Sequence, residues 1–578
     1  MRNIVVKSSI ALTASQKKKL EKGLEKKYGA EVVYTYLQDE ILGGIVVDDG
    51  EHVIDYSFSS LLKDFRAQSD VYFDEVVKNK GELPAYWGKE LVDKANLDPT
   101  VTPCGRVVAS ADGIITIEGL PDCKYYELLE IGDGNYAIAM NLLSDCVKAM
   151  LITGSTGIEY GVTAIGTGKI VEVPVGDGLL GRVVNPLGKP IDGDDTLRFD
   201  KVRPIERGAP KIIDRDKVTR PLLTGILAID SMIPIGKGQR ELIIGDRQTG
   251  KSSIAIDAII NQKDKDVICI YVAIGQRAGT IGKLIAKLKN AGAMKNTVLV
   301  VSTASDNAAL QYIAPYTGCA IGEEFMAQGK DVLIVYDDLS KHANAYRTIS
   351  LLLKRPSGRE AYPGDVFYIH SRLLERSAQL SSKKGGGSMT AIPIIETQAG
   401  DISQYIPTNV ISITDGQIYL ESELFNSGVR PAVNVGLSVS RVGGSAQFKA
   451  VRKLSSQLRL DLAHYRELAL FAQFGAEVDD NTRAILAKGE KVTEILKQKE
   501  GDPMSVDREI IYLYMIGKHI DDVPANKVNE YIEGFYRYFA KSDHLTAKEI
   551  RESGAISGKA EKAINKALND YNVYYTHG

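Results

Sequence analysis

The 578-residue sequence predicts a multidomain α/β protein that begins with a small α+β module, continues through a β-barrel and a mostly parallel sheet, and ends in helices. Three observations predict this order. Short alternating apolar runs separated by glycines fill the second part, which is typical of a small barrel. In the third part, apolar strand-like runs alternate with helical stretches, which indicates a parallel sheet buried on both faces. From about Gly444 onward, Leu, Ala, Lys and Glu recur at helical spacing.

The first element is an α+β module over residues 1–67. Its expected parts are a strand at 4–6, a Lys-rich helix opened by a capping box at 13–16, strands at 31–37, 44–48 and 52–55 with a turn at 49–50, and a helix near 61–65. Residues 68–98 contain Pro84 and Trp87 and lack the Gly/Ser enrichment of flexible tethers. We therefore expect an ordered connector there.

The next elements are the barrel over 99–195 and the α/β domain over 196–443. Alternating runs at 106–108, 113–117, 136–140 and 162–173 indicate the barrel strands. Apolar runs predict sheet strands at 241–245, 267–273, 297–301, 331–336, 391–395 and 410–414. Residues 444–578 are expected to form a helical bundle.

Composition and charge exclude several classes of protein. The 71 Lys+Arg against 74 Asp+Glu leave a formal charge of -3, so the basic field of a nucleic-acid-binding protein is missing. No run approaches the roughly 18–20 apolar residues of a membrane span, and the start does not read as a signal peptide, so we expect a cytoplasmic chain without direct membrane insertion. Five widely spaced cysteines without a CxxC pair indicate neither a disulfide framework nor a zinc site.

The most specific motif is a complete G-x-x-x-x-G-K-[ST] match between an apolar strand and a helix. In such a loop, backbone N–H groups and the helix N-terminus face a phosphate. Lys251 is then expected to reach the β/γ-phosphates and Ser252 to bind Mg²⁺. The predicted nucleotide-binding residues are Gly245, Asp246, Arg247, Gln248, Thr249, Gly250, Lys251, Ser252 and Ser253.

Two aspartates follow the apolar run 331–336. Asp337 comes directly after the strand and is the predicted second Mg²⁺ ligand, whereas Asp338 is expected to cap the next turn. His342 has no Cys, His or Asp cluster beside it, which favours a surface or helix-capping histidine over a metal ligand.

From about Gly105 to about Asp502, the chain strongly resembles the alpha subunit of the F1 sector of the rotary ATP synthase. Besides the phosphate loop, the resemblance is carried by segments 175–185, 235–240, 359–366, 395–401, 438–443 and 471–475. It implies a RecA-like nucleotide-binding domain between the barrel and the helices. It also implies an F1-type ATP synthase or ATPase as the active assembly, with Mg-ATP or Mg-ADP as ligand.

Single residues separate alpha from its catalytic partner beta. Gln276 stands where beta-like chains carry the glutamate that polarises the attacking water, and an amide cannot accept a proton. The resemblance thus implies a site that holds Mg-ATP and hydrolyses it slowly or not at all. It assigns Arg441 as an arginine finger that enters the neighbouring beta site. Arg430, Pro431 and Gln498 match the adenine pocket, where Glu500 replaces a glutamine found in many alpha chains.

Residues 3–65 resemble the C-terminal domain of the separate delta subunit, through Leu42-Gly43-Gly44 and Val53-Ile54-Asp55. In the family, that domain joins the head to the peripheral stalk. The implied partners are beta chains in a hexamer of three alpha and three beta chains, a gamma-type central shaft, and a peripheral stalk or another partner bound by residues 1–65. The implied location is the inner face of the cell membrane, in a complex.

Two other functions stay open. An F1-like motor can drive machinery other than a proton channel, for example surface motility, and the sequence does not decide between the two. A self-sufficient P-loop ATPase of the export or helicase type is disfavoured by Gln276, because such enzymes need a glutamate there. The near-neutral charge also disfavours a helicase.

Overall fold

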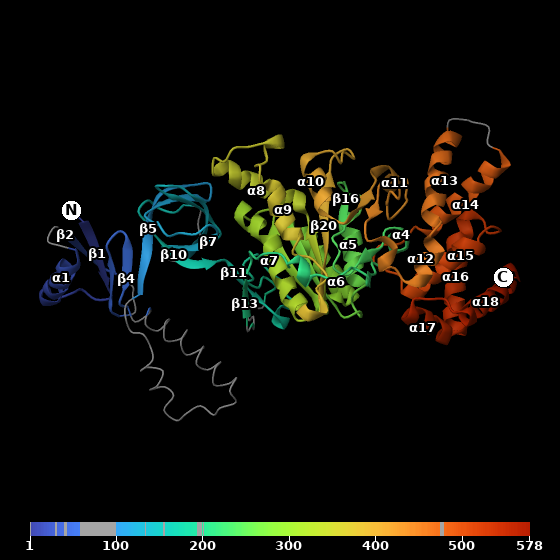
Figure 1. Ribbon diagram of the computed structural model, residues 1–578, viewed down its shortest axis with the longest axis horizontal. Coiled ribbons are helices and arrows are strands. Elements are labelled where there is room, and N and C mark those ends of the chain that lie inside the picture. The colour runs from blue at the N-terminus through green and yellow to red at the C-terminus, as the bar shows by residue number, and fades with distance from the viewer. Residues whose placement is uncertain are drawn as a thin grey trace, which may run out of the picture. The chain divides into compact units, whose positions relative to one another are not determined.

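The computed structural model describes residues 2–28, 32–39, 43–57, 60, 100–132, 134–153, 157–193, 199, 201–473 and 479–577 (Figure 1). They fall into two compact units, Met1–Val171 and Glu172–Gly578, each of which is considered by itself. The predicted helix near 61–65, the connector 68–98 and the segments 41–42 and 474–475 lie outside the described residues.

The N-terminal module has the predicted order of a strand, a helix and three further strands. Its elements are β1 (Arg2–Ser8), α1 (Ala14–Tyr28), β2 (Val32–Gln38), β3 (Ile45–Asp48) and β4 (His52–Asp55). The capping box is present, because the Thr13 N–H donates to Gln16 Oε1 (2.9 Å) and the Gln16 N–H donates to Thr13 Oγ1 (3.4 Å). One face of the sheet packs against apolar residues of the helix and its approach, in a core of Ile4, Val6, Val47 and Ile54 with Leu12, Leu20 and Leu24.

The barrel consists of β5 (Thr100–Ala111), β6 (Ile114–Glu118), β7 (Glu127–Ile131), β8 (Asn135–Leu142), β9 (Val147–Leu151) and β10 (Thr163–Ile170). The strands pair in the order β10-β7-β8-β9-β6-β5, and β5 pairs again with β10. This closure leaves no free edge between them. The predicted barrel is confirmed.

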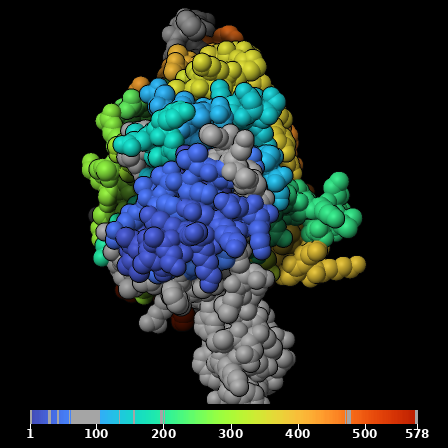
Figure 2. Space-filling model, turned by 90° about the vertical axis from the view of Figure 1, so that its left-hand side faces the viewer, coloured from blue at the N-terminus to red at the C-terminus, as the bar shows by residue number. Residues whose placement is uncertain are grey.

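The module and the barrel share one sheet. The first residues of β5 pair antiparallel with β4, from His52↔Pro103 to Asp55↔Thr100, and the rest of β5 belongs to the barrel. The joined sheet has ten strands. Figure 2 faces the module (blue), with part of the barrel (light blue to cyan) behind it.

An ion pair strengthens this junction. Arg106 of β5 donates through NH2 to Asp48 Oδ2 (2.6 Å), and through NH1 to the carbonyl oxygen of Gly161 (3.2 Å) and the hydroxyl of Thr163 (3.1 Å). Asp48 is only 5% exposed. A partly buried Arg–carboxylate pair is screened by solvent less than a surface pair is. The module is thus built onto the barrel through both backbone and side-chain contacts.

The second unit is built on an eight-stranded sheet. Its strands are β12 (Val183–Val184), β16 (Leu242–Asp246), β17 (Val267–Gln276), β18 (Thr297–Thr303), β19 (Asp331–Asp337), β20 (Ser388–Thr397), β21 (Gly416–Leu420) and β22 (Val439–Ser440). The order is β12-β18-β17-β19-β20-β16-β21-β22, and all pairings except β21 with β22 are parallel. Two small ribbons pair β11 (Glu172–Val175) with β13 (Lys201–Pro204), and β14 (Pro221–Leu222) with β15 (Ile235–Gly236).

Helices cover this sheet on both faces (Figure 1). The helices of this domain are α4 (Leu227–Met232), α5 (Lys251–Ile260), α6 (Ala278–Ala291), α7 (Ala308–Ala327), α8 (Leu339–Leu352), α9 (Val366–Leu374), α10 (Tyr405–Ile413) and α11 (Ser422–Asn426). Because both faces are covered, the central strands are nearly continuously apolar, and this is the signal that predicted five of them correctly.

The predicted strand at 410–414 is wrong, because residues 410–413 form the last turn of α10. Ile406, Val410 and Ile413 are buried at spacings of four and three, which is the period of a helix face. A short apolar run does not distinguish this period from a strand. The sheet strand of this region is β21, which begins at Gly416.

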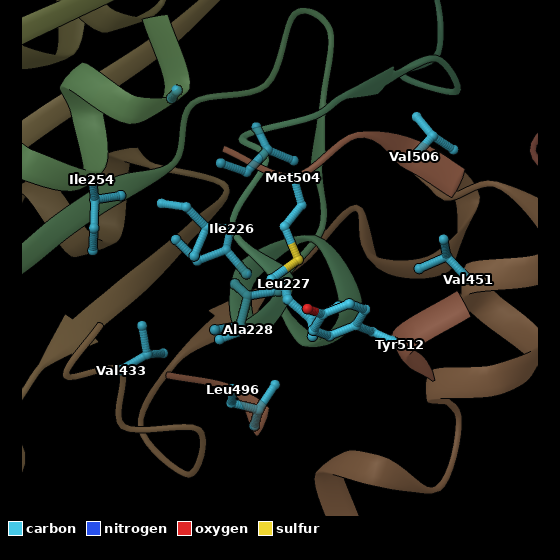
Figure 3. Packing of buried hydrophobic residues seen from close by; sticks show 14 of the residues in the cluster. Ile226, Leu227, Ala228, Ile254, Val433, Val451, Leu496, Met504, Val506 and Tyr512 are labelled. Carbon is cyan, nitrogen blue, oxygen red and sulfur yellow. The ribbon is translucent and has the colours of Figure 1, made fainter. Parts of the chain in front are cut away.

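The C-terminal part is helical, as predicted. Its helices are α12 (Lys449–Ser455), α13 (Leu458–Gln473), α14 (Asp480–Ile495), α15 (Val506–Lys518), α16 (Val528–Ser542), α17 (His544–Ser553) and α18 (Gly558–His577). Their core is continuous with that of the sheet domain: Figure 3 shows Leu227 close to Met504 and Tyr512. None of the helices in the described ranges is both long and apolar enough to cross a membrane.

Candidate nucleotide-binding site

A cavity of about 1210 Å³ lies at the carboxyl ends of β16, β17 and β19. This edge of a parallel sheet is the usual place for a ligand. The cavity brings together residues from several distant parts of the sequence. The predicted residues that line it are Arg247, Gln248, Thr249, Gly250, Lys251, Ser252, Ser253, Gln276, Asp337, Arg430, Pro431 and Gln498, together with Glu500; Gly245, Asp246 and Arg441 do not line it.

The phosphate loop joins β16 to α5 in a conformation that needs its glycines. Gly250 has φ 94° immediately before α5, in the left-handed region that favours glycine. A Cβ on Gly245 would lie 2.5 Å from the Leu420 carbonyl oxygen, so only glycine allows this approach of the two strands. The backbone N–H groups at the start of α5 are therefore available to an anion.

Asp246 has a supporting role that the motif did not predict. Its carboxylate accepts hydrogen bonds from the Thr397 hydroxyl (2.7 Å), the Gly400 N–H (2.8 Å) and the Ser422 hydroxyl (3.0 Å). Burial opposes the charge, but these bonds prevail and lower the pKa of Asp246. The residue anchors the phosphate loop to segments that follow β20 and β21.

Lys251 is held within the loop and is only 7% exposed. Its ammonium donates to the Gly245 carbonyl oxygen (2.9 Å) and to that of Asp246. Burial lowers the pKa of Lys251, although the nearby carboxylates of Glu396, Asp338 and Asp337 act in the opposite direction. A cation in such a place can exchange carbonyl oxygens for phosphate oxygens, with which it forms stronger charge-assisted bonds.

Asp337 and Ser252 form a pair of hard oxygen donors. The Ser252 hydroxyl donates to Asp337 Oδ2 (2.8 Å), and the Tyr271 hydroxyl donates to the same oxygen. Mg²⁺ is usually bound by one or two such groups together with phosphate oxygens. In the described part of the chain no cluster of three or more His, Cys, Asp or Glu side chains could hold a metal alone. The donor set thus fits an ion that arrives with a phosphate ligand.

Gln276, at the end of β17, faces the same aspartate. Its amide nitrogen donates to Asp337 Oδ1 (3.1 Å) and to the Asp337 carbonyl oxygen (3.2 Å). Asp338 instead caps α8 by accepting from the Lys341 N–H (2.8 Å), as its position predicted. Burial raises the pKa of Asp338 to about 6. The group next to Asp337 at this end of β17 is therefore an amide, which is a hydrogen-bond donor and not a base.

The other end of the cavity is built from the chain around Gln498. The Gln498 amide donates to the Gly225 (2.7 Å) and Asp502 (2.8 Å) carbonyl oxygens and accepts from the Leu227 N–H (3.2 Å). Its side chain thus fixes the loop before α4. Glu500 is ion-paired with Lys287 (2.5 Å), whose hydrogen bond lowers the pKa of the Glu500 carboxyl.

Three contributors to this end of the cavity were not predicted. Phe425 and Asn529 line the cavity, and Lys287 neutralises Glu500. The Arg430 guanidinium lies 4.3 Å from the centre of the Phe425 ring, at cation–π distance. Asn529 comes from α16, far away in the sequence, and no local pattern marks it.

Arg441 lies apart from this cavity, directly after the edge strand β22. Its N–H donates to the Asp415 carbonyl oxygen (2.8 Å), and its side chain is exposed. The guanidinium forms no hydrogen bond or ion pair with any residue in the described ranges. An arginine with a fixed backbone and an unpaired, exposed guanidinium can act on a group outside its own chain.

His342 is not the surface or helix-capping residue that was predicted, because it is fully buried. Its Nε2 lies 3.0 Å from the Tyr312 carbonyl oxygen, and its Nδ1 lies 3.2 Å from Nε2 of His370. Burial lowers the pKa of both imidazoles, that of His370 to about 4. Burial favours the neutral imidazole, which a protein core can hold, so the sequence around an isolated histidine in a helix does not reveal its exposure.

A pair of carboxyl groups joins the loop before α4 to the helical domain. Asp230 accepts from the Thr224 N–H (3.0 Å), the Thr224 hydroxyl (2.8 Å) and the Gly225 N–H (2.8 Å). Glu509 of α15 is 1% exposed and lies near Asp230, and neither of its carboxyl oxygens accepts a hydrogen bond from a described residue. Burial, and then the charge of Asp230, raise the pKa of Glu509 well above its usual value, while Lys265 acts weakly in the opposite direction. Burial thus favours the protonated form of Glu509, which could donate a hydrogen bond to Asp230.

We expect Glu509→Gln to stabilise the protein increasingly as the pH rises. A group whose pKa is raised by folding makes its full contribution to the free energy of unfolding at pH values below its unfolded-state pKa. This contribution is lost as the pH rises through the folded-state pKa, by about 1.4 kcal/mol per pH unit for one proton. Glutamine donates to Asp230 at every pH. The difference in apparent melting temperature between variant and wild type should therefore grow from pH 5 to pH 8.

The matched control is Glu561→Gln, on the exposed ion pair with Lys518 (3.1 Å). A surface pair contributes little, so its difference from wild type should stay small across the same range. Equal pH dependence for the two variants would show that Glu509 is not protonated in the folded state.

Comparisons with known proteins agree with this geometry. Three family models match: "ATP synthase alpha/beta family, nucleotide-binding domain" over 225–440, "ATP synthase alpha/beta chain, C terminal domain" over 447–571, and "ATP synthase delta (OSCP) subunit" over 1–68.

Curated relatives named ATP synthase subunit alpha match most of the chain. The protein of Caldanaerobacter subterraneus subsp. tengcongensis is 56% identical over 472 residues, which cover 82% of this chain and 93% of the relative. Those of Dehalococcoides mccartyi and Clostridium botulinum are 54% and 55% identical over 485 and 488 residues, covering 84% of this chain and 96% and 97% of the relatives. The chain therefore belongs to the ATP synthase alpha subunit family and carries at its N-terminus a domain of the delta (OSCP) family.

Proposed function

We propose that the chain is a non-catalytic, Mg-ATP-binding alpha subunit of an F1-type rotary ATPase or ATP synthase. The observation that carries this proposal is the contact between Gln276 and Asp337 in an otherwise complete phosphate site. A general base must accept a proton from the attacking water, and the Gln276 amide cannot do so. The site therefore retains the groups that bind a nucleotide and lacks the residue expected to activate water.

The binding step follows from the residues of the cavity. The N–H groups at the start of α5 and the Lys251 ammonium bind the phosphates, aided by the positive end of the helix dipole. Ser252 and Asp337 hold the Mg²⁺ ion, which when bound neutralises phosphate charge. Arg430, Pro431 and the loop fixed by Gln498 surround the base.

Catalysis is proposed to occur on a neighbouring beta chain, in a hexamer around a gamma-type shaft. Arg441 is the residue of this chain that takes part, by placing its guanidinium against charge that develops on the γ-phosphate. The support is its exposed guanidinium, which forms no hydrogen bond or ion pair in the part of the chain that the structure describes, on a backbone fixed to Asp415. Arginine suits this task because its planar fork binds phosphate oxygens in a bidentate manner.

The N-terminal module is proposed to attach the head to a peripheral stalk or to another partner at the inner face of the cell membrane. The support is the shared sheet and the Asp48–Arg106 pair, which would pass a force from the module into the barrel without a flexible linker. A head with three alpha chains carries three such modules. This number favours several attachments per head, or attachment to machinery other than a single off-axis stalk.

Equilibrium binding and phosphate release by the isolated chain test the non-catalytic assignment. We expect saturable binding of Mg-ATP with negligible turnover, because the site lacks a base at Gln276. The assembled hexamer with its beta partner serves as the active control in the same assay. Multiple turnovers by the isolated chain at rates comparable to the hexamer would refute the assignment.

Deletion of residues 1–65 tests the docking role. We expect the truncated hexamer with its shaft to keep ATP hydrolysis largely unchanged and to lose its native attachment, because the module lies far in sequence from the nucleotide cavity and belongs to the other compact unit. Co-purification of partners from the native source, followed by mass spectrometry, is the measurement. Lys7→Ala, which removes an exposed ion pair with Asp39 (3.0 Å), is the control that leaves the module in place. If the truncated head still retains every native partner, the docking role is wrong.

A further inference from the structure

The backbone that carries Arg441 is fastened at the edge of the sheet. Arg441 follows β22, whose residues pair with β21 as Gly416↔Ser440 and Gln417↔Val439. A Cβ on Gly416 would lie 2.1 Å from the Val439 carbonyl oxygen, so the close approach of the two strands requires glycine there. The position of Arg441 is thus set by the start of β21, and in particular by Asp415, which accepts its N–H.

Asp415 is in turn clamped by Arg240, the residue before Glu241 and β16. Its carboxylate accepts three hydrogen bonds from this one residue, from the backbone N–H (3.0 Å), from Nε (2.9 Å) and from NH2 (2.8 Å). The Asp415 N–H donates back to the Arg240 carbonyl oxygen (2.8 Å). Two residues joined by four hydrogen bonds have little freedom to shift relative to each other. The Arg240 guanidinium is also only partly exposed, so solvent screens its ion pair with Asp415 less than it screens a surface pair.

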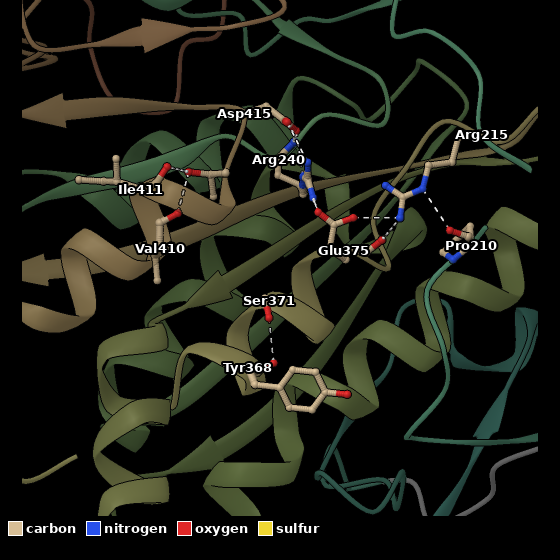
Figure 4. A network of polar contacts seen from close by, with 10 residues as sticks. Pro210, Arg215, Arg240, Tyr368, Ser371, Glu375, Val410, Ile411 and Asp415 are labelled. Atoms are coloured by element: carbon tan, nitrogen blue, oxygen red, sulfur yellow. Dashed lines mark hydrogen bonds and ion pairs between the residues drawn. The ribbon is translucent and has the colours of Figure 1, made fainter. Parts of the chain in front are cut away.

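A chain of ion pairs extends the clamp (Figure 4). Arg240 also pairs with Glu375, and Glu375 pairs with Arg215 (2.9 Å), which donates to the Pro210 carbonyl oxygen (3.1 Å). The planar Arg240 guanidinium is therefore held between two carboxylates, Asp415 on one side and Glu375 on the other. These contacts on both sides fix the orientation of the guanidinium plane.

Gln239, next to Arg240, supports the other side of the same turn. Its amide donates to the Ser440 hydroxyl (3.1 Å) and to the buried Glu241 carboxyl (2.7 Å). The Ser440 hydroxyl donates to the Pro234 carbonyl oxygen (2.7 Å). The residues immediately before β16 thus hold the start of β21 and the end of β22, after which Arg441 follows.

We propose that Arg240 and Asp415 are positioning residues that place Arg441 for its action on the neighbouring subunit. The inference rests on the proposed in-trans role of Arg441. Neither residue touches the nucleotide cavity of its own chain, so the pair acts through Arg441 alone. A displacement of about 1 Å at a reacting group can cost about 10²-fold in rate, and the clamp removes that freedom from the backbone.

The test is a double-mutant cycle in the assembled hexamer with Asp415→Ala, Arg441→Ala and the combined variant. We expect Asp415→Ala to lower kcat about 10–100-fold with KM unchanged. In the Arg441→Ala background the same substitution should cause no further loss, because the group that it positions is gone. Nucleotide occupancy of this chain's own site should not change.

Two further variants separate positioning from a general structural defect. Asp415→Asn keeps the side chain's shape and should lose less activity than Asp415→Ala. Native mass spectrometry monitors the assembly of the hexamer for each variant. Asp331→Ala removes a comparable bidentate pair, with Arg220 (2.8 and 2.6 Å), at the start of β19. Its effect should simply multiply with that of Arg441→Ala.

The outcomes distinguish the two proposals. If Asp415→Ala lowers kcat by the same factor with and without Arg441, or if it lowers nucleotide occupancy in parallel, the positioning role is refuted while the in-trans role stands. Full activity of Arg441→Ala would instead refute the in-trans role itself, and the positioning role with it.

Discussion

Arg441→Ala is expected to abolish rapid ATP hydrolysis by the assembled hexamer, with a loss of about 10³–10⁵ in kcat. The guanidinium would act on charge that is present mainly in the transition state, so its removal should change kcat far more than nucleotide binding. Steady-state hydrolysis by the reconstituted hexamer, with nucleotide binding measured in parallel, is the test. Assembly should be unaffected, because the side chain is exposed and no hydrogen bond or ion pair joins its guanidinium to a described residue.

The matched control is Arg483→Ala, on an exposed arginine of α14 that forms an ion pair with Asp480 (2.9 Å). Its activity should stay within a factor of two of wild type, since surface ion pairs contribute about 0–1 kcal/mol. Arg441→Lys keeps the charge but not the planar fork, so we expect a partial loss. A mild loss for Arg441→Ala, similar to that of the control, would contradict its proposed role.

The phosphate end of the site was predictable from the sequence because its determinants are local. A strand, a glycine loop and a helix follow one another within about twenty residues, and their geometry is fixed by the motif itself. Asp337 was predictable for the same reason, as the residue that ends an apolar run. The structure places Lys251, Ser252, Asp337 and Gln276 in one cavity.

The end of the cavity around Gln498 was less predictable because its contacts join distant segments. The Gln498 amide forms hydrogen bonds with the backbone of Gly225 and Leu227, and Lys287 forms an ion pair with Glu500. Neither contact follows from spacing along the chain. The error at residues 410–414 has a different cause, since a short apolar run fits both a strand and one face of a helix. The burial of His342 depends on Tyr312 and His370, which lie about thirty residues away on other helices.

The joining of the N-terminal module to the barrel was also beyond the sequence. Alternation predicts strands at 52–55 and 106–108, but it predicts neither the extension of β5 back to Thr100 nor which strands pair. Pairing across a long sequence separation carries no local signal. The Asp48–Arg106 pair is likewise a contact between two segments that were predicted correctly but separately. The local pattern therefore predicted which residues form strands. The contacts that join the module to the barrel became known only from the tertiary structure.

Lys251→Ala is expected to have the opposite profile to Arg441→Ala. It should weaken binding of Mg-ATP to this chain's own site about 10–100-fold, because a charge-assisted hydrogen bond to a phosphate is worth roughly 1.5–3 kcal/mol. Hydrolysis by the hexamer should be largely retained, since Lys251 lies in the cavity of this chain and not beside Arg441. Equilibrium binding with the isolated chain, and hydrolysis with the hexamer, measure the two effects separately.

Lys384→Ala provides a cation-deletion control for Lys251→Ala, because Lys384 is exposed and its ion pair with Asp214 is long (3.7 Å). Its binding of Mg-ATP should equal that of wild type. The Lys251 ammonium is buried among carbonyl oxygens and carboxylates, and a buried charge is costly to leave unpaired. A phosphate therefore finds a preorganised partner at Lys251, whereas the exposed Lys384 offers none. If Lys251→Ala and Arg441→Ala gave the same mild loss of hydrolysis and the same loss of binding, then binding and in-trans catalysis would not be divided between these two residues.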